Sequence, residues 1–205
     1  METRCVVLDI GGVLEMTPET GWDEEWERRL GLPTGSMHRR LDDIWKAGSI
    51  GGITEDEVRA QVAAVLDLDA VRTDAFMADL WDEYLGSPNE ELIAYVRSLR
   101  TRCRLGILSN SFVGAREREQ KLYGFGDLVD DIVYSHEIGV SKPAAAAFEV
   151  TCARLGVRPE DCLFVDDAED NIAAAEAFGM RGLLFADNAE TVAGIEAHLT
   201  RRRAR

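Results

Sequence analysis

Five short apolar runs, separated by stretches with helical periodicity, constrain the fold of this chain more than any other feature. They are CVVLD at 5–9, RLGILSN at 104–110, DIVYS at 131–135, CLFVD at 162–166 and GLLFA at 182–186. Such continuous runs are typical of strands that are buried in a parallel sheet. Between them, residues such as Phe148, Cys152 and Leu155 recur at the spacing of one helix face. The alternation predicts an α/β fold with a doubly wound parallel sheet.

The interval 16–86 interrupts this alternation, because it holds helical patterns and no convincing strand. Thr54 and Glu57 fit a capping box at the start of one helix, and glycines mark a flexible loop just before it. We predict a core of residues 1–15 and 87–205, with a helical cap of residues 16–86 inserted after the first strand. The apolar residues that indicate the cap helices are Val58, Val62, Val65, Phe76, Leu80 and Tyr84, and the loop glycines are Gly48, Gly51 and Gly52.

Composition narrows the class of partner. The 205 residues carry a formal net charge of −15, and residues 16–86 hold 16 acidic and 7 basic side chains, a local balance of −9. A chain this acidic repels phosphate backbones, so we expect no nucleic-acid partner. The first apolar run is too short for a signal peptide or a membrane span, so we expect a cytoplasmic protein with no membrane partner. The oligomeric state stays open.

The cysteines, tryptophans and histidines have ordinary structural explanations. Four scattered cysteines without a CxxC pair are expected to be reduced core thiols. All four tryptophans fall in the predicted cap, where they form its core; in a sharper alternative, one of them covers a sugar or other ring of the substrate together with the loop 48–53. His136 is expected to pack or cap, and the other two histidines to be solvated. These residues are Cys5, Cys103, Cys152, Cys162, Trp22, Trp26, Trp45, Trp81, His38 and His198.

Polar residues follow several of the predicted strands at their carboxyl ends, where ligands bind in sheets of this kind. Asp9 ends the first run, Ser109 and Asn110 the second, and Asp166 and Asp167 the fourth, while Lys142 follows the third. Clustered aspartates repel one another unless a hard cation joins them, and an oxygen-only set of ligands favours Mg²⁺. Gly11 and Gly12 offer backbone groups that approach a ligand closely. The pattern fits phosphoryl transfer with Asp9 as nucleophile.

The chain resembles the haloacid dehalogenase superfamily, in its branch with a helical cap after the first motif. VVLDIGGVL, ILSN, SHEIGVSKP and FVDDAEDNIAAAEAFGM are similar to its four motifs, in order. The resemblance implies a Mg²⁺-dependent phosphatase that acts on a small phosphorylated metabolite. Asp9 would be nucleophile and metal ligand, and Ser109 and Lys142 would hold the phosphoryl oxygens. The Gly11 carbonyl, Asp166 and Asp167 would complete the metal site, and Gly12 and Asn110 would contact the substrate.

Gly11 departs from this pattern, since most phosphatases of the superfamily carry there a second aspartate that serves as general acid and base. Three explanations stay open: the leaving group is intrinsically good, as in an anomeric sugar phosphate; another residue, such as Glu15, donates the proton; or the protein is not a phosphatase. The alternatives are a catalytically weak or inactive phospho-ligand binder and a 2-haloacid dehalogenase. The retained acidic pair, Asp166 and Asp167, favours phosphate chemistry over metal-free dehalogenation.

Overall fold

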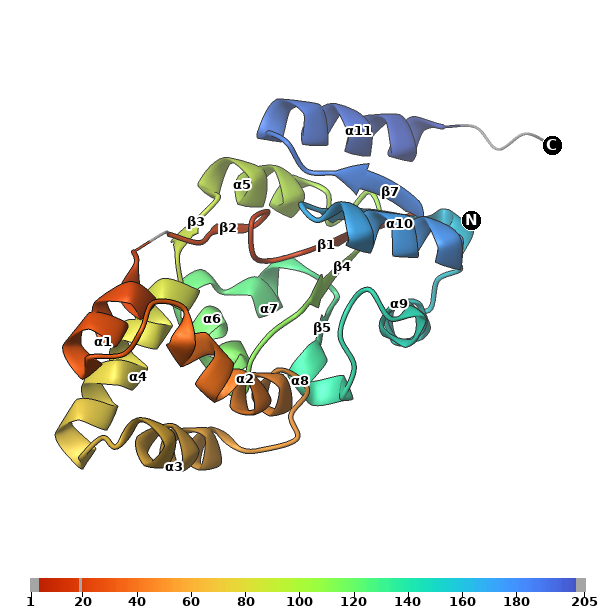
Figure 1. Ribbon diagram of the computed structural model, residues 1–205. Helices are drawn as coiled ribbons and strands as arrows, with labels where there is room; N and C mark the ends of the chain where they lie inside the picture. The colour runs from red at the N-terminus through yellow and green to blue at the C-terminus, as the bar shows by residue number, and fades with distance from the viewer. Residues whose placement is uncertain (1–3, 19, 202–205) are drawn as a thin grey trace.

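The computed structural model describes residues 4–18 and 20–201, and within them the predicted parallel sheet is present (Figure 1). The strands run in parallel in the order β5-β4-β1-β6-β7, with β1 at the centre and buried at every residue. The α/β, doubly wound prediction is confirmed. The strands are β1 (Cys5–Leu8), β4 (Arg104–Ser109), β5 (Asp131–Tyr134), β6 (Cys162–Asp166) and β7 (Arg181–Leu184).

Helices cover both faces of this sheet. Because side chains alternate along a strand, Val6 and Leu8 of β1 face one apolar cluster, and Cys5 and Val7 face another. The first cluster is completed by α5 (Glu90–Ser98), α7 (Phe125–Leu128) and α11 (Asn188–Thr200), and the second by α9 (Ala145–Leu155) and α10 (Glu169–Phe178). The remaining helices of this part are α6 (Ala115–Tyr123), α8 (Ser135–Ile138) and the 3-10 helix Pro159–Asp161.

The interval between β1 and β4 is helical, as predicted. Its helices are α1 (Trp22–Leu30), α2 (Ser36–Ser49), α3 (Glu55–Leu66) and α4 (Ala70–Tyr84). The Thr54 and Glu57 capping box is present at the start of α3. The chain enters and leaves this helical layer through a short antiparallel pair, β2 (Glu15–Met16) and β3 (Ser87–Pro88). The sequence pattern missed this pair because each strand is two residues long. The domain boundaries at 16 and 86 stay a prediction.

Strand register places the polar strand ends at one edge of the sheet. Leu8 of β1 pairs with Ile107 of β4 on one side and with Val165 of β6 on the other. Asp9 and Asp166 therefore come at the same level, and Ser109 comes one residue further along, at the carboxyl ends of three adjacent strands. This edge faces the layer of helices α1 to α4 (Figure 1).

Several local predictions are corrected by the structure. Gly48 lies inside α2 and not in a loop. Leu66 takes the buried position on α3, and Val65 is 41% exposed, because the buried face follows the spacing Val58, Val62, Leu66. His198 is fully buried, and its Nε2 lies 3.2 Å from the carbonyl oxygen of Asp161. The four cysteines are buried free thiols, as predicted.

Candidate active site

Asp9 is the first residue after the central strand, and its side chain is 12% exposed. Its backbone N–H still donates to the Val165 carbonyl at 2.9 Å, so the residue is held by the sheet. One carboxylate oxygen, Oδ1, accepts from the Ile10 backbone N–H at 2.8 Å, and Oδ2 lies 2.8 Å from Nζ of Lys142. The carboxylate is thus fixed in position before any ligand binds.

Lys142 links two of the predicted site aspartates. It is 4% exposed, and its Nζ lies 2.7 Å from Oδ2 of Asp166 as well as close to Asp9. Its backbone is held by the Asn110 side chain, which accepts from the Lys142 N–H at 2.8 Å and donates to the Lys142 carbonyl at 3.0 Å. Asn110 therefore orients the lysine, and its predicted contact with the substrate stays a prediction.

Asp166 is held by residues of its own loop and of the next helix. Its Oδ1 accepts from the Ala168 backbone N–H at 2.9 Å and from Nδ2 of Asn171 at 3.0 Å, and the residue is fully buried. This role of Asn171 was not predicted from the sequence. Its position indicates the contact, because it lies five residues after Asp166 in the first turn of α10, from where a side chain can reach the end of the strand.

Asp167 completes a carboxylate cluster. Ligand oxygens of Asp9, Asp166 and Asp167 all lie within 4.8 Å of one another. Gly12 permits this arrangement, because a Cβ built on it would stand 2.1 Å from Oδ2 of Asp167. Gly12 also has φ +71°, a conformation that costs other residues energy. Gly12 is therefore required both by its backbone and by the close approach of Asp167.

The electrostatics of this cluster fit a divalent cation. Three carboxylates face one ammonium group, which leaves a formal excess of two negative charges. The pKa of Asp9 is raised to about 7, mainly by burial; the charge of Lys142 lowers this pKa, and the charge of Asp166 raises it. Burial, followed by the charge of Asp166, also raises the pKa of Asp167. A hard cation with oxygen ligands would relieve this repulsion, so the donor set suits Mg²⁺.

Ser109 and Gly11 flank Asp9 on the neighbouring backbone. Ser109 ends β4, is 3% exposed, and makes a long hydrogen bond of 3.4 Å from Oγ to the Asn110 carbonyl. Its hydroxyl is therefore weakly held and available to a phosphoryl oxygen. The space beside Gly11 is open, since a Cβ built there would have the Thr17 hydroxyl, at 4.0 Å, as its nearest neighbour.

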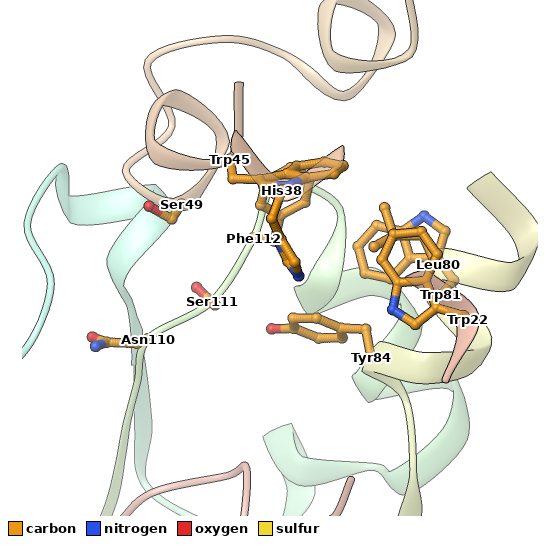
Figure 2. Close-up of a pocket in the computed structure, with 10 residues that line it drawn as sticks. All are labelled: Trp22, His38, Trp45, Ser49, Leu80, Trp81, Tyr84, Asn110, Ser111 and Phe112. Carbon is orange, nitrogen blue, oxygen red and sulfur yellow. The ribbon is translucent and has the colours of Figure 1, made fainter. Parts of the chain in front are cut away.

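A cavity of about 370 Å³ opens between the helical layer and the end of β4 (Figure 2). Most of its wall is aromatic. The side chains at its base follow Ser109 directly in the chain, so the cavity begins next to the site just described. It is lined by Trp22, His38, Trp45, Ser49, Leu80, Trp81, Tyr84, Asn110, Ser111 and Phe112.

The tryptophans divide between the two roles expected for them. Trp26 lies in the apolar core of the helical layer with 3% exposure, and its ring packs edge-on against Phe76. Trp22, Trp45 and Trp81 line the cavity. These three also pack in the helical layer, since Trp22 and Trp45 contact its apolar core and Trp81 is buried, so the structural role is present and the contact with a substrate ring stays a prediction.

The profile of haloacid dehalogenase-like hydrolases matches residues 3–179, which is most of the chain. The chain belongs to the haloacid dehalogenase-like hydrolase family. This membership confirms the resemblance drawn from the four motifs and makes the protein a hydrolase. The parallel sheet, the strand-end aspartates and the inserted helices are consistent with that family.

Several of the curated relatives are named as phosphatases. The chain is 29% identical over 212 residues to Phosphatase MT3486 of Mycobacterium tuberculosis, which covers 98% of this chain and 95% of that protein. It is 26% identical over 190 residues to a D-ribitol-5-phosphate phosphatase of Bacteroides thetaiotaomicron, covering 86% and 88%. These relatives support a phosphomonoesterase of the haloacid dehalogenase type.

Solved structures show the same fold. A haloacid dehalogenase family enzyme from Bacteroides thetaiotaomicron, in complex with magnesium and inorganic phosphate, aligns with a TM-score of 0.76 at 21% identity, over 89% of this chain and 93% of that one. A family member from Porphyromonas gingivalis aligns with a TM-score of 0.79 at 23% identity, over 98% and 100%. Within the part of our chain that the structure describes, no helix has the length and apolar character that crossing a membrane requires.

Two buried glutamates lie near the site. Glu15 is 3% exposed, and its Oε2 accepts from the Thr17 hydroxyl at 3.1 Å. Burial raises the pKa of Glu15, and hydrogen bonds from Thr17 and the Gly86 backbone lower it. Its carboxyl is therefore directed toward the two linkers of the helical layer. Glu119 accepts from the Tyr134 hydroxyl at 2.5 Å, and burial raises its pKa to about 7.

His136 packs beside the cavity, in line with its expected structural role. Its Nδ1 lies 2.6 Å from Oγ of Ser111, which lines the cavity. Burial lowers the pKa of His136. The lowered pKa favours the neutral ring, and the hydrogen bond with Nδ1 holds the Ser111 hydroxyl in position.

Proposed function

We propose that this hydrolase is a magnesium-dependent phosphomonoesterase that acts on a small phosphorylated metabolite through an aspartyl-phosphate on Asp9. The observation that carries the proposal is the placement of the Asp9 carboxylate within 2.8 Å of the Lys142 ammonium and within 4.8 Å of the Asp166 and Asp167 carboxylates. A nucleophile, a phosphate-binding cation and a set of metal ligands thus converge at one strand end.

The residues that would hold Mg²⁺ are Asp9, Asp166, Asp167 and the carbonyl of Gly11. When bound there, the ion supplies positive charge that neutralises the phosphoryl oxygens. Gly12 supports the set by leaving room for the Asp167 carboxylate. The phosphatase relatives and the magnesium complex of the similar structure support this choice of ion.

In this proposal each protein group has one role. An oxygen of Asp9 forms a bond to phosphorus while the bond from phosphorus to the leaving oxygen breaks, and the electron pair leaves with that oxygen. Lys142 and the Ser109 hydroxyl bind the equatorial oxygens, and the Gly12 N–H approaches the same group. Water then attacks phosphorus, which restores the Asp9 carboxylate and releases inorganic phosphate.

We also propose that residues 16–86 form a cap over a core of residues 1–15 and 87–205, so that the leaving group lies between them. The cavity supports this division, because helices α1, α2 and α4 supply one wall and the segment after β4 supplies the other. The substrate in this scheme is a small molecule.

The test is hydrolysis of p-nitrophenyl phosphate and acetyl phosphate with Mg²⁺ and with a chelator, for the natural sequence and for Asp9→Asn. Both leaving groups need little protonation, so the absence of an acid at Gly11 does not limit them. We expect Mg²⁺-dependent release of phosphate that falls by at least about 10³-fold in Asp9→Asn.

Other outcomes assign other functions. Halide release from 2-chloropropionate without metal, and no phosphate release, would replace the proposal with a dehalogenase. Mg²⁺-dependent binding of a phosphate ester with no turnover of either probe would make the protein a phospho-ligand binder.

A further inference from the structure

The cavity beside Asp9 is walled by rings that hold one another in place. Trp45 and Phe112 pack edge-on with ring centroids 5.6 Å apart, and Trp81 packs edge-on against Phe112 at 6.3 Å and against Tyr84 at 5.2 Å. Such contacts restrict the rotation of each ring, so the walls are largely formed before a ligand enters. Trp22 and Leu80 complete the apolar surface.

The two sides of the cavity differ in character. Asn110 and Ser111 lie on one side, Trp22, Leu80 and Trp81 lie together on the other, and the His38 ring and the Tyr84 hydroxyl lie between them (Figure 2). The polar end is the end next to Ser109, and Asn110 is joined to the Lys142 backbone. A ligand that fills the cavity therefore has its phosphate at the Asn110 end and an apolar group at the other.

The lining residues include no lysine, arginine, aspartate or glutamate that could bind a polyhydroxylated leaving group through charge-assisted hydrogen bonds. Six of the ten are aromatic, and the neutral polar ones are Ser49, Asn110 and Ser111. The Arg118 guanidinium stacks over the Trp81 ring, 3.9 Å from its centroid, and its Nη2 lies 2.6 Å from a carboxylate oxygen of Glu55, so this cation is engaged away from the ligand. Sugar hydroxyls buried against these rings would lose hydrogen bonds to water without replacement, which is unfavourable.

The glycine at position 11 favours some apolar leaving groups over others, according to whether they need a proton to depart. No acid stands two residues after Asp9, so a leaving oxygen that departs without a proton is favoured. A phenol has a pKa of about 10, against about 16 for water, and aliphatic alcohols are about as weakly acidic as water. An aryl oxygen therefore leaves as a far weaker base than an alkyl oxygen does.

We infer that the preferred substrates are small aryl phosphomonoesters, whose aromatic ring occupies this cavity. The inference rests on the proposed function. The bond between phosphorus and the aryl oxygen breaks as Asp9 attacks, the electron pair leaves with that oxygen, and the phenolate takes a proton from solvent. A cavity of about 370 Å³ suits a leaving group of one or two rings.

One acyl phosphate and three phosphate esters separate ring recognition from leaving-group chemistry. Acetyl phosphate has a good leaving group that does not fill the cavity; phenyl phosphate fills it; cyclohexyl phosphate fills it but leaves poorly; and glucose 1-phosphate is polar. We expect kcat/KM for phenyl phosphate to exceed that for glucose 1-phosphate by about 10²-fold or more. Cyclohexyl phosphate should show a similar KM and a kcat at least about 10²-fold lower.

A cavity variant and a matched control locate the effect. Trp45→Ala should raise KM for phenyl phosphate by about tenfold relative to KM for acetyl phosphate. Trp26→Phe, at a tryptophan that does not line the cavity, should leave both substrates unchanged. Retained acetyl phosphate turnover shows that each variant is folded.

A binding measurement adds a readout independent of turnover. Benzylphosphonate, a non-hydrolysable analogue of phenyl phosphate, should quench tryptophan fluorescence and bind at least about tenfold more tightly than methylphosphonate, and Trp45→Ala should remove this difference.

The outcomes distinguish the two proposals. If acetyl phosphate is not hydrolysed, the proposed function fails. If acetyl phosphate is hydrolysed but glucose 1-phosphate matches phenyl phosphate, or cyclohexyl phosphate turns over as fast as phenyl phosphate, the aryl assignment is overturned and the phosphatase stands.

Discussion

Restoring an acid at position 11 is the sharpest perturbation of this site. A Cβ at Gly11 would meet the Thr17 hydroxyl at 4.0 Å and nothing nearer, and the residue does not have the positive φ that Gly12 has. Gly11→Asp therefore adds a carboxyl group without displacing the backbone. It places an acid two residues after Asp9, where most phosphatases that resemble this chain carry one.

The expected gain depends on the leaving group. General acid catalysis typically contributes about 10²–10⁴-fold to rate, which corresponds to about 3–5 kcal/mol of transition-state stabilisation. An alkyl oxygen, as in cyclohexyl phosphate, needs the proton and should gain at least about 10²-fold in kcat. The leaving group of p-nitrophenyl phosphate does not need the proton, so release of p-nitrophenol in the first turnover should change by no more than about threefold. Steady-state phosphate release measures the alkyl ester and first-turnover release of p-nitrophenol the aryl ester, both at saturating substrate and Mg²⁺.

Gly11→Asn is the matched control, because asparagine has nearly the same size and cannot serve as the acid. It should leave kcat for both esters near that of the natural sequence. If Gly11→Asp raised alkyl and aryl turnover equally, or raised neither while remaining folded, the argument that the missing proton donor limits this enzyme would be wrong. An equal gain in Gly11→Asn would point to packing instead of proton transfer.

Two further predictions address the metal site and a buried carboxyl. Gly12→Ala places a side chain on left-handed backbone, which costs about 1–2 kcal/mol, and it also displaces Asp167. The control, Gly156→Ala, has φ +65° and open space around it, so it has the backbone cost alone. We expect similar losses of thermal stability in both variants, and only in Gly12→Ala a Mg²⁺ requirement raised at least about tenfold in activity titrations. Burial raises the pKa of Glu119 from 4.5 to about 7, although the hydrogen bond from Tyr134 lowers it. Between these two pH values the folded state keeps a proton on Glu119 that the unfolded state releases. The free energy of unfolding therefore falls as pH rises from about 4.5 to 7. Glu119→Gln should unfold like the natural sequence at pH 4.5 and be more stable by up to about 3 kcal/mol at pH 8 in thermal melts, and an equal difference at both pH values would refute the assignment.

The strand ends were predictable because two local rules act together there. A continuous apolar run indicates a buried parallel strand, and the first polar residue after it must lie where helices do not cover the sheet. Asp9 and Asp166 were found in this way, and Lys142 by its place in the third motif of the resemblance; the structure brings Lys142 into contact with both aspartates. The capping box of Thr54 was equally local.

Side-chain direction in the helical layer was not predictable by the same rules. Phe76 and Tyr84 share the spacing of one helix face, yet Phe76 is fully buried in the core of the layer and Tyr84 lines the cavity. The difference arises from where α4 meets Phe112, a residue distant in sequence. The burial of His198 likewise depends on Asp161, which lies on another element.

The segment after β4, residues 110–113, contacts both the helical layer and Lys142. A Cβ at Gly48 of α2 would stand 2.2 Å from the Phe112 ring, and the Val113 N–H donates to the Gly48 carbonyl at 3.2 Å, so the helical layer contacts this segment closely. Two residues earlier in the same segment, Asn110 holds both the N–H and the carbonyl of Lys142. The residues that contact the helical layer and the residue that holds the Lys142 backbone therefore lie on one short stretch of chain, residues 110–113.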